Sequence, residues 1–472
     1  MQFKRHHDDP AALAKRKGRV LNLLQLLYRR QDFSPLPVIA SGFAALILLG
    51  SVLLSLPVAS AQAQPVSWYD ALFTSTSAVC VTGLVVRDTG TAYSVFGHAV
   101  LLVLIQMGGL GFMTFATLVF RLMGRGITLR DRMIMQDSMN EDMLGGVVKL
   151  VQWVVASTFC VELTGALLFS IRMIPRYGVA KGIFFSIFHS VSAFCNAGFD
   201  LFGGGSSLTG FSEDALIQLS AIALVVIGGL GFGVLNDLLT RKSFRRFRLH
   251  TKLALVSYFS LMLISFVMVL TLEWSNPATL GPMPVGQKLL NAFFQSITLR
   301  TAGFNTYDQQ AQRDATKLIC CLMMLIGAAP ASTGGGIKVT TAAIVILTAR
   351  MVARGETCIR VFGRRIDVSL IHRALAIVFI AMALVFVDVF ALSLMQPDAA
   401  FLDLLYECAS AMGTVGISAI GTASLNGFSR FLIILTMFAG RVGPLTLALL
   451  ISRRQNHARE LINYPEEHVM IG

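Results

Sequence analysis

One short motif occurs four times along the 472-residue chain, and this repetition limits the possible folds more than any other feature. Each copy begins with an aromatic residue, continues through small hydroxyl or thiol residues, and ends on a glycine that an apolar residue follows. The copies occupy residues 73–83, 188–198, 294–303 and 406–416, and the third is one residue shorter. The final glycines lie 115, 105 and 113 residues apart. This period is too long for a solenoid and favours a repeated subdomain of two membrane helices with a short segment between them.

The composition indicates an integral membrane protein. Hydrophobic residues make up 55% of the chain and charged residues 14%, whereas soluble proteins carry about 25% charged residues. The mean hydropathy is +0.69. The net charge of +13 raises the question of a nucleic-acid ligand, but Lys and Arg gather in five patches at 1–36, 121–149, 241–252, 350–373 and 453–472. The positive-inside rule places such patches on the cytoplasmic side of a membrane, so we expect no nucleic acid.

Apolar segments follow one another in four triplets, each long, short and long. A spanning helix needs about 20 apolar residues, which the outer segments of each triplet supply and the middle segment does not. The long segments are 37–58, 91–122, 148–174, 215–240, 253–272, 318–350, 369–395 and 428–452, and the short ones are 67–79, 181–194, 286–299 and 400–412. Each unit is therefore predicted to be a helix, a re-entrant pore helix and a second helix, with both ends on the cytoplasmic side.

The predicted fold is an all-α polytopic membrane protein, with four tandem helix–pore helix–helix units around one pseudo-fourfold pore. Unpaired backbone groups cannot face lipid without a large energetic cost, so the glycine-ending segments must be buried in protein or line water. The alternative, four ordinary surface hairpins, would not require the same string of small residues four times. We expect a cytoplasmic arm at 1–36 and pore units at 37–133, 134–248, 249–366 and 367–472, the last including the C-terminal tail.

The second long segments carry a repeated glycine motif. The sequence Gly-Gly-Leu-Gly-Phe stands at 108–112 and again at 228–232, and a looser version occupies 438–443. Glycine in a membrane helix lets another backbone approach closely. We therefore predict that these spans pass beneath the re-entrant segments, with ordinary helix packing as the alternative.

The second span of the third unit is interrupted. It is apolar to Leu325, reads Gly-Ala-Ala-Pro-Ala-Ser-Thr-Gly-Gly-Gly-Ile-Lys over 327–338, and resumes at Val339. Proline removes a backbone donor, consecutive glycines favour no single conformation, and such a stretch inside a span is tolerated only against a cavity. We predict that this loop is the moving gate of a pore, with a static kink as the alternative. The predicted gate residues are Gly327, Pro330, Ala331, Ser332, Thr333, Gly334, Gly335, Gly336, Lys338 and, in the last span, Arg441.

The residues that end each motif have the chemistry of a potassium filter. Backbone carbonyls can replace the water shell of K⁺, glycine permits the tight turn that this requires, and the negative C-terminal end of each pore helix favours a cation. The predicted K⁺ ligands are the carbonyls of Val81, Thr82, Gly83, Asn196, Ala197, Gly198, Thr301, Ala302, Gly303, Thr414, Val415 and Gly416. No other metal site is predicted.

Three cations lie within the predicted membrane region. Lys338 and Arg441 are expected to face the pore below the filter, where either would repel K⁺, and salt bridges inside the helix bundle are the alternative. Arg300 stands three residues before the third final glycine. Side chains of a carbonyl-lined filter face outward, so we predict that Arg300 is buried scaffold with Glu407 as its first candidate partner.

The four units, the Gly-Gly-Leu-Gly-Phe spans and the Ala-Ser-Thr-Gly-Gly-Gly-Ile-Lys loop resemble the Trk/Ktr/HKT superfamily of potassium transporters over residues 37–452. No further hydrophobic pair precedes Pro37, which favours the KtrB-type membrane subunits over the TrkH type. The resemblance implies that K⁺ is the substrate and that Na⁺ often stimulates its uptake. One departure from the repeat is Gly413, where the first two copies have Cys80 and Cys195.

The same resemblance implies partners and a location. Such proteins are homodimers with one pore per protomer, multi-pass in the bacterial inner (cytoplasmic) membrane with both termini cytoplasmic. A cytosolic ring of RCK subunits of the KtrA type controls the gate, and a nucleotide, ATP/ADP or NAD, is expected on that ring and not on this chain. An alternating-access carrier would predict inverted repeats, whereas these units run in the same direction. We expect no enzymatic activity, because the eight histidines form no HExxH motif and no nucleophilic-serine turn occurs.

Overall fold

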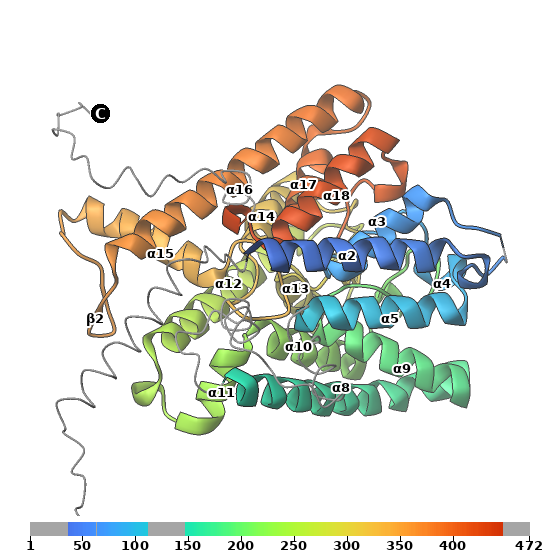
Figure 1. Ribbon diagram of the computed structural model, residues 1–472, viewed down its shortest axis with the longest axis horizontal. Helices are drawn as coiled ribbons and strands as arrows, with labels where there is room; N and C mark the ends of the chain where they lie inside the picture. The colour runs from blue at the N-terminus through green and yellow to red at the C-terminus, as the bar shows by residue number, and fades with distance from the viewer. Residues whose placement is uncertain (1–35, 63, 112–146, 447–472) are drawn as a thin grey trace, which may run out of the picture.

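The computed structural model describes residues 36–62, 64–111 and 147–446. The expected N-terminal arm, the first unit's second span after Gly111, most of the basic patch at 121–149 and the C-terminal tail lie outside these residues. Within them almost all of the regular secondary structure is helical, as predicted (Figure 1). The sheet of this described part is a single hairpin of two short strands, β1 (Arg360–Val361) and β2 (Arg364–Arg365).

Each unit contributes a long helix, a short helix and a second helix. The long first helices are α2 (Leu36–Ser55), α8 (Val147–Tyr177), α12 (Leu249–Glu273) and α16 (Val368–Met395). The short helices are α3 (Trp68–Val79), α9 (Val179–Phe194), α13 (Val285–Thr298) and α17 (Phe401–Gly413). The second helices are α5 (Val95–Leu110), α10 (Ala215–Gly229) with α11 (Phe232–Arg241), α14 (Asp314–Leu325) with α15 (Val339–Ala353), and α18 (Gly427–Val442). Single turns lie between them at α4 (Thr89–Ala92), η1 (Pro57–Ala59), η2 (Thr209–Phe211), η3 (Phe244–Arg246) and η4 (Thr422–Ser424).

The four first helices have the length and apolar composition of membrane spans. The surface of α16 carries large exposed apolar side chains, which are unfavourable in water. Phe379, Phe386 and Phe390 leave 75%, 74% and 60% of their areas exposed, and apolar area of this size is stable against lipid rather than water. The short helices behave differently, since most residues of α9 and α17 are buried. In Figure 1, α13 accordingly lies near the centre of the molecule, with α16 above it and α8 below.

The prediction of a continuous second span at 215–240 is wrong. Helices α10 and α11 meet at an angle of 95°, because Gly231 between them has a φ of +87°, a value that residues with a β-carbon rarely adopt. Helices α5 and α18 also end beside left-handed glycines, Gly111 and Gly443. Where the structure describes helices on both sides of a break, the break in the third unit, at 326–338, is longer than that in the second, at 230–231. Residues 326–338, between α14 and α15, are called the intramembrane loop below.

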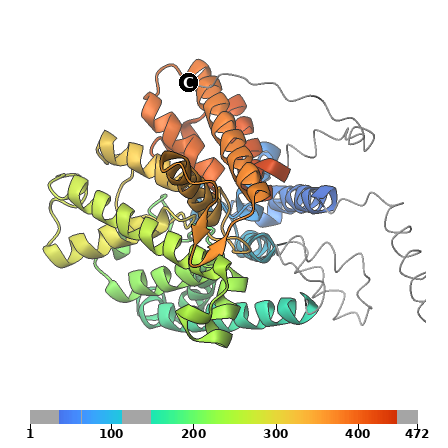
Figure 2. The same ribbon diagram turned by 90° about the vertical axis from the view of Figure 1, so that its left-hand side faces the viewer.

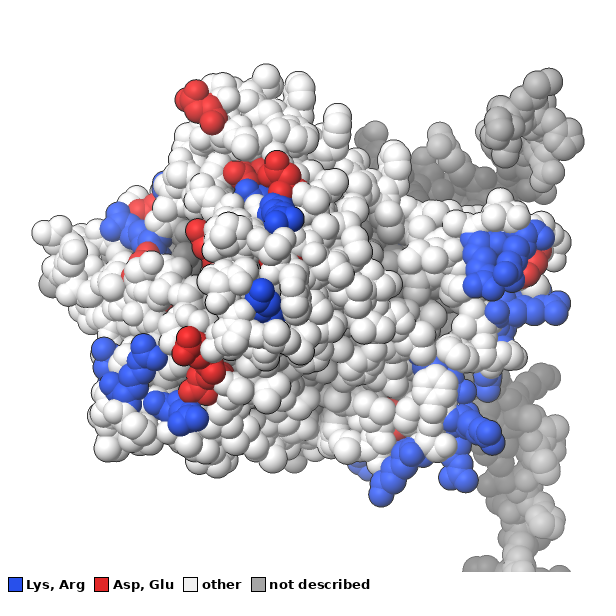
Figure 3. All heavy atoms as spheres, turned by 180° about the vertical axis from the view of Figure 1, so that it is seen from behind, with Lys and Arg blue, Asp and Glu red and all other residues white. Residues whose placement is uncertain are grey.

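Basic side chains gather at one end of the molecule. Figure 3 shows Lys and Arg concentrated at the end that carries the hairpin and α11, and Figure 2 looks onto this end. The tip of the hairpin contacts the turn before α12, where the rings of Phe244 and Phe362 lie 5.8 Å apart. The ammonium of Lys252 lies over both rings. Hairpin and turn thus form one basic surface that joins the end of α15 to the start of α12.

Candidate functional site

The four motif ends share one unusual backbone conformation. A residue with a left-handed φ follows each short helix, at 49° for Val81, 58° for Asn196, 68° for Thr301 and 52° for Thr414. The final glycines also have positive φ values, from 68° to 95°. Residues with side chains rarely adopt such angles, so the same uncommon turn forms four times with four different side chains. Residues 81–83, 196–198, 301–303 and 414–416 are called the ring segments below.

The ring segments meet around one axis. A β-carbon built on each final glycine would press on the carbonyl oxygen that precedes the final glycine of a neighbouring unit. The pairs are Gly83 with Ala197 at 2.5 Å, Gly198 with Ala302 at 2.9 Å, Gly303 with Val415 at 2.6 Å, and Gly416 with Thr82, which would overlap. Because the fourth unit contacts the first, the ring is closed. The structure thus brings together all twelve residues that the sequence singled out.

Small hydroxyl residues of the motif hold the ring segments from behind. Ser77 and Ser410 accept hydrogen bonds from the backbone N–H groups of the final glycines in their own units, both at 3.0 Å. Ser192 and Thr298 donate to the carbonyls just after the final glycines, at 2.8 and 2.5 Å. This is why hydroxyl residues recur in the motif. Their role was not predicted, although their equal placement in the four copies was a signal for it.

The carbonyls at the centre of the ring have no protein donor. Among the described residues, no hydrogen bond is made to the backbone oxygens of Thr82, Ala197, Ala302 and Val415. Buried carbonyls are normally paired, so this arrangement leaves four acceptors available to a ligand. The short helices also end here, and the negative ends of their dipoles favour a positive one.

A cavity of about 370 Å³ lies on one side of the ring. The four final glycines form its floor, and Asp88, Asp200 and Asp308 are among its other lining residues. Burial raises the pKa of the Asp200 carboxyl to about 6, and the nearby charge of Asp88 contributes to the rise. Carboxylates in a recessed opening concentrate cations from solution, so this cavity is suited to admit them.

The intramembrane loop lies against the opposite side of the ring. Thr301 and Thr414 are the first residues of their ring segments and contact the loop directly. A β-carbon on Gly334 would overlap the hydroxyl oxygen of Thr301, and one on Gly335 would overlap that of Thr414. Gly335 also donates its N–H to the hydroxyl of Thr414 at 3.1 Å. The predicted position of the loop beneath the ring is therefore what the structure has.

Neighbouring units hold the loop in place. Its N–H groups bond to carbonyls at the glycine-rich ends of α10 and α18, from Ala329 to Gly229 at 3.0 Å, from Thr333 to Gly228 at 3.2 Å and from Gly336 to Gly440 at 3.1 Å. Its own carbonyl at Ala331 accepts from Phe232 at the start of α11, at 2.9 Å. Within the loop, Ser332 bonds to Ala329, and Pro330 packs against Gly231. The loop depends on contacts from three other helices for its shape.

Lys338 and Arg441 bond to backbone carbonyls. Lys338 donates to Gly334 of the loop at 2.7 Å. Arg441 donates to Thr333 of the loop and, on its other side, to Gly108 and Gly109 at the end of α5. Neither cation has a carboxylate partner among the residues that the structure describes, so this part of the chain holds none of the salt bridges considered as the alternative. Arg441 instead clamps the loop to the first unit.

Glycines of the second spans touch the ends of the short helices, as predicted. β-carbons on Gly108, Gly228 and Gly440 would overlap carbonyl oxygens in the last turns of α3, α9 and α17. Close backbone approach, rather than ordinary helix packing, therefore accounts for this glycine motif in three units.

Arg300 is fully buried, as expected of scaffold, but its predicted partner is wrong. Its guanidinium donates to the carbonyls of Met323 and Ile326 at the end of α14. The carboxylate of Glu407 accepts from Ser418 and Thr422 instead, both at 2.5 Å. The two side chains point in different directions. Glu407 accepts hydrogen bonds from the segment that follows its own ring segment, whereas Arg300 points towards the second helix of its own unit.

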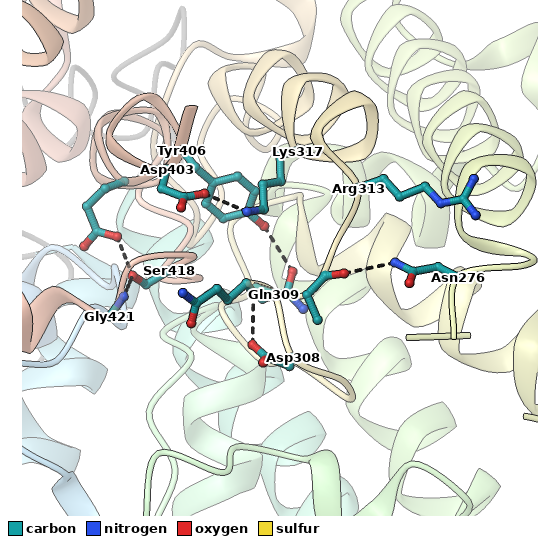
Figure 4. A network of polar contacts seen from close by, with 12 residues as sticks. Asn276, Asp308, Gln309, Arg313, Lys317, Asp403, Tyr406, Ser418 and Gly421 are labelled. Atoms are coloured by element: carbon teal, nitrogen blue, oxygen red, sulfur yellow. Dashed lines mark hydrogen bonds and ion pairs between the residues drawn. The ribbon is translucent and has the colours of Figure 1, made fainter. Parts of the chain in front are cut away.

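A polar network between the third and fourth units was not predicted (Figure 4). The hydroxyl of Tyr406 donates to Gln309 at 3.0 Å, and the buried Lys317 pairs with Asp403 at 2.7 Å. Both contacts join α17 to the segment around α14. They tie the third unit to the fourth beside the outer cavity, which Gln309 also lines.

Comparison with known proteins adds a family to this geometry. The family described as TrkH, cation transport protein, matches residues 38–459. The Ktr system potassium uptake protein B of Bacillus subtilis is 41% identical over 93% of this chain and 97% of its own length. The potassium/sodium uptake protein NtpJ of Enterococcus hirae is 36% identical over 94% of this chain and 98% of its own. Both relatives are thus similar along nearly their whole length.

A solved structure has the same fold. The crystal structure of the potassium transporter TrkH from Vibrio parahaemolyticus superposes with a TM-score of 0.69, covering 89% of this chain and 86% of that one, at 18% sequence identity. At this identity the likeness concerns the arrangement of helices alone.

Proposed function

Because the chain belongs to the TrkH family of cation transport proteins, we propose that it is the potassium-conducting membrane subunit of a Ktr-type uptake system. The single observation that carries the proposal is the closed ring of four unpaired carbonyls, one from each unit. The names of its relatives, which are potassium uptake proteins, support the choice of ion. The units at 37–133, 134–248, 249–366 and 367–472 are proposed to supply one quarter of the pore each.

K⁺ passes the ring by exchanging water for backbone oxygens. The carboxylates of the outer cavity concentrate the ion, and the ring segments 81–83, 196–198, 301–303 and 414–416 replace its hydration shell. The carbonyls need not move to bind, because hydroxyl groups fix the backbone from behind. Such preorganisation favours the ion that fits the fixed spacing over Na⁺. The four segments differ in side chains, so the ion sites lack exact fourfold symmetry.

The intramembrane loop is the gate. Residues Gly327, Pro330, Ala331, Ser332, Thr333, Gly334, Gly335 and Gly336 occupy the path directly behind the ring, and Lys338 and Arg441 hold them there. The loop is held by a small number of hydrogen bonds, most of them to backbone carbonyls and one to the hydroxyl of Thr414, rather than by a packed core. Two arrangements of similar energy, closed and withdrawn, follow from such a design.

A cytosolic regulator controls this gate in the proposed system. Its docking site is the basic surface formed by the hairpin and η3. This surface joins the end of α15 to the end of α11. The first residue of α11, Phe232, bonds in turn to the loop. The regulator is a ring of RCK subunits of the KtrA type that binds the nucleotide, ATP/ADP or NAD. The subunit is a homodimer in the bacterial inner membrane with both termini cytoplasmic. Na⁺ stimulates uptake, in keeping with the name of the potassium/sodium relative.

Ion flux into liposomes tests the proposal. The purified chain is reconstituted alone and with a cytosolic RCK protein, and uptake of ⁸⁶Rb⁺ is measured against ²²Na⁺. We expect slow Rb⁺ uptake by the chain alone and faster uptake with the regulator. Equal permeation of both ions, or no uptake under either condition by protein shown to be folded, contradicts the proposal.

A further inference from the structure

Arg300 connects the ring to the beginning of the intramembrane loop. We infer that Arg300 is a positioning residue that anchors the end of α14 to the third ring segment and thereby holds the loop across the pore. The inference rests on the proposed function, because it assigns a role in gating. It concerns a residue whose side chain contacts neither the ion path nor the regulator surface.

The anchor is a buried charge whose oxygen acceptors are backbone carbonyls. Arg300 has no exposed surface, and within the described part of the chain no carboxylate pairs with it. One amino group donates to the carbonyl of Met323 at 3.0 Å and to that of Ile326, while the other contacts the sulfur of Met323 at 3.2 Å. The last carbonyls of a helix lack partners within it, and a cation there complements the helix dipole. The guanidinium therefore caps α14 at the residue where the loop begins.

The other three units show what this arginine replaces. The equivalent positions are Cys80, Cys195 and Gly413, none of which can form such a cap. In those units the second span approaches the short helix through glycine, at Gly108, Gly228 and Gly440. The third unit has a long interruption at this level. An arginine thus occurs only in the unit whose second span has no glycine against the last turn of its own short helix. Its close backbone contact is with the fourth unit, where a β-carbon on Gly413 would overlap the carbonyl oxygen of Met324.

Both ends of the loop depend on the anchored residue. A parallel bridge joins Ile326 to Ile337, and the N–H of Gly327 donates to the carbonyl of Ile337 at 2.8 Å. A shift of Ile326, at the start of the loop, would therefore also move Ile337 near its end. The backbone of Arg300 is itself fixed, because the side-chain amide of Asn196 donates to its carbonyl at 3.2 Å. Arg300 therefore links the backbone of the ring to the first residue of the loop.

The experiment compares Arg300→Gln and Arg300→Lys with the wild type in the liposome assay, with and without the RCK protein. Glutamine has too short a side chain to cap both carbonyls, and lysine can bond to one. We expect regulator-free flux to rise about tenfold in Arg300→Gln, since hydrogen bonds to charged groups shift equilibria by roughly that factor or more, and to rise less in Arg300→Lys. The KM for K⁺ stays at the wild-type value. Arg430→Gln is the control, because Arg430 also donates to a carbonyl, that of Ala423 at 2.6 Å, and pairs with Asp70 at 3.3 Å, but forms no hydrogen bond to the described loop residues.

A second measurement follows the loop itself. A cysteine at Ser332, in a background with Cys160 and Cys358 replaced by serine, should react faster with a thiol reagent in Arg300→Gln and in Arg300→Lys than with Arg300 intact. This readout keeps the test valid if one variant is too unstable for flux measurements. Combining Arg300→Gln with deletion of 331–336 should give no gain beyond the deletion, because the anchor acts through the loop.

Three results would overturn the inference: unchanged reactivity at position 332, a gain that adds fully to that of the deletion, or altered K⁺ preference with normal dependence on the regulator. The last would make Arg300 scaffold for the ring alone. Failure of the proposed function looks different, because then the wild type conducts no K⁺ or the deletion leaves flux unchanged whatever stands at position 300.

Discussion

Gly83 of the first unit lies so close to Ala197 of the second that a β-carbon on Gly83 would be 2.5 Å from the carbonyl oxygen of Ala197. The same relationship is repeated around the ring, and each glycine also has a positive φ. A side chain at any of these positions therefore meets two penalties, steric overlap with a neighbouring unit and backbone strain.

Substituting a final glycine is expected to weaken ion selection. Serine at position 83, 198, 303 or 416 costs about 1–3 kcal/mol in backbone strain, and relief of that strain displaces a carbonyl of the ring. We expect the K⁺ preference over Na⁺ to fall about tenfold or more, by the usual relation of free energy to affinity ratio. Competition of Na⁺ with ⁸⁶Rb⁺ uptake measures it. Gly286→Ser is the control, because that glycine has open space around it; four ring variants with wild-type preference would remove the filter assignment.

Shortening the intramembrane loop is expected to open the pore. Deletion of 331–336 removes the residues that lie against Thr301 and Thr414, so regulator-free flux should rise and dependence on the regulator should fall. Arg441→Ala should act in the same direction but more weakly, because it frees one clamp and leaves the N–H contacts of the loop. Liposome flux with protein of checked monodispersity measures both. A folded deletion variant with wild-type or lower flux and full regulator dependence fits a static kink instead.

Neutralising the basic turn is expected to weaken regulator binding. Arg245, Arg246 and Arg248 stand in or beside η3, and their replacement by glutamine should reduce copurification of the RCK ring. Attraction to anionic lipid, worth about 1 kcal/mol per basic residue, is the competing role. Copurification in detergent distinguishes the two, since no bilayer is present. A matched triple variant at the opposite end, Lys181, Lys288 and Arg313 to glutamine, should retain the regulator; unaltered binding by both leaves only the lipid account.

The two ends of the molecule are expected to face opposite sides of the membrane. Cysteines placed at Gln62 and Trp274 should react with an impermeant reagent added outside intact cells, whereas cysteines at Arg245 and Arg360 should react only after lysis. Arg125 and Arg459 should behave like Arg245, although they lie outside the described residues. Labelling of position 245 from outside would reverse the proposed orientation of all four units.

Potassium uptake is expected to depend on external pH through Asp200. Burial raises the pKa of its carboxyl to about 6, so the group is mostly charged at neutral pH and becomes neutral as the pH falls below that value. The apparent affinity for external K⁺ should therefore decline between about pH 7 and pH 5, one unit on either side of the pKa. Asp200→Asn should have the low affinity throughout and lack this transition. Asp398→Asn, at an exposed position, should keep it; a wild-type transition in Asp200→Asn would assign the pH dependence to another group.

The sequence predicted local features better than long-range partners. The ends of the loop, Leu325 and Val339, agree with α14 and α15 to the residue, because proline and glycine disrupt a helix wherever they stand. The bend at Gly231 was missed, since a single glycine inside an apolar run is also compatible with a straight span. At Gly231 a β-carbon would overlap the carbonyl oxygen of Pro330, which lies 99 residues away in the sequence, and a contact over that distance cannot be read from the local pattern.

The partner of Arg300 shows the same limit within the site. Proximity in the repeat suggested Glu407, but whether a buried guanidinium meets a carboxylate or the end of a helix depends on how α14 and α17 pack. The ring residues were predictable because four copies display the same backbone requirement. The hydroxyl residues behind them carried an equally regular signal, and their role emerged once the N–H groups that they satisfy were known.

The ring is built from main-chain atoms supplied by a single polypeptide, and this has a consequence for how such a chain can change over generations. Each copy can carry its own side chains, as Val-Thr, Asn-Ala, Thr-Ala and Thr-Val before the glycine show, provided that the glycine and a hydroxyl behind it are present. One quadrant can therefore carry an arginine and a long interruption while all four supply a glycine to the ring. Four identical chains encoded by one gene could not differ in this way, because any change would appear in all four quarters of the ring.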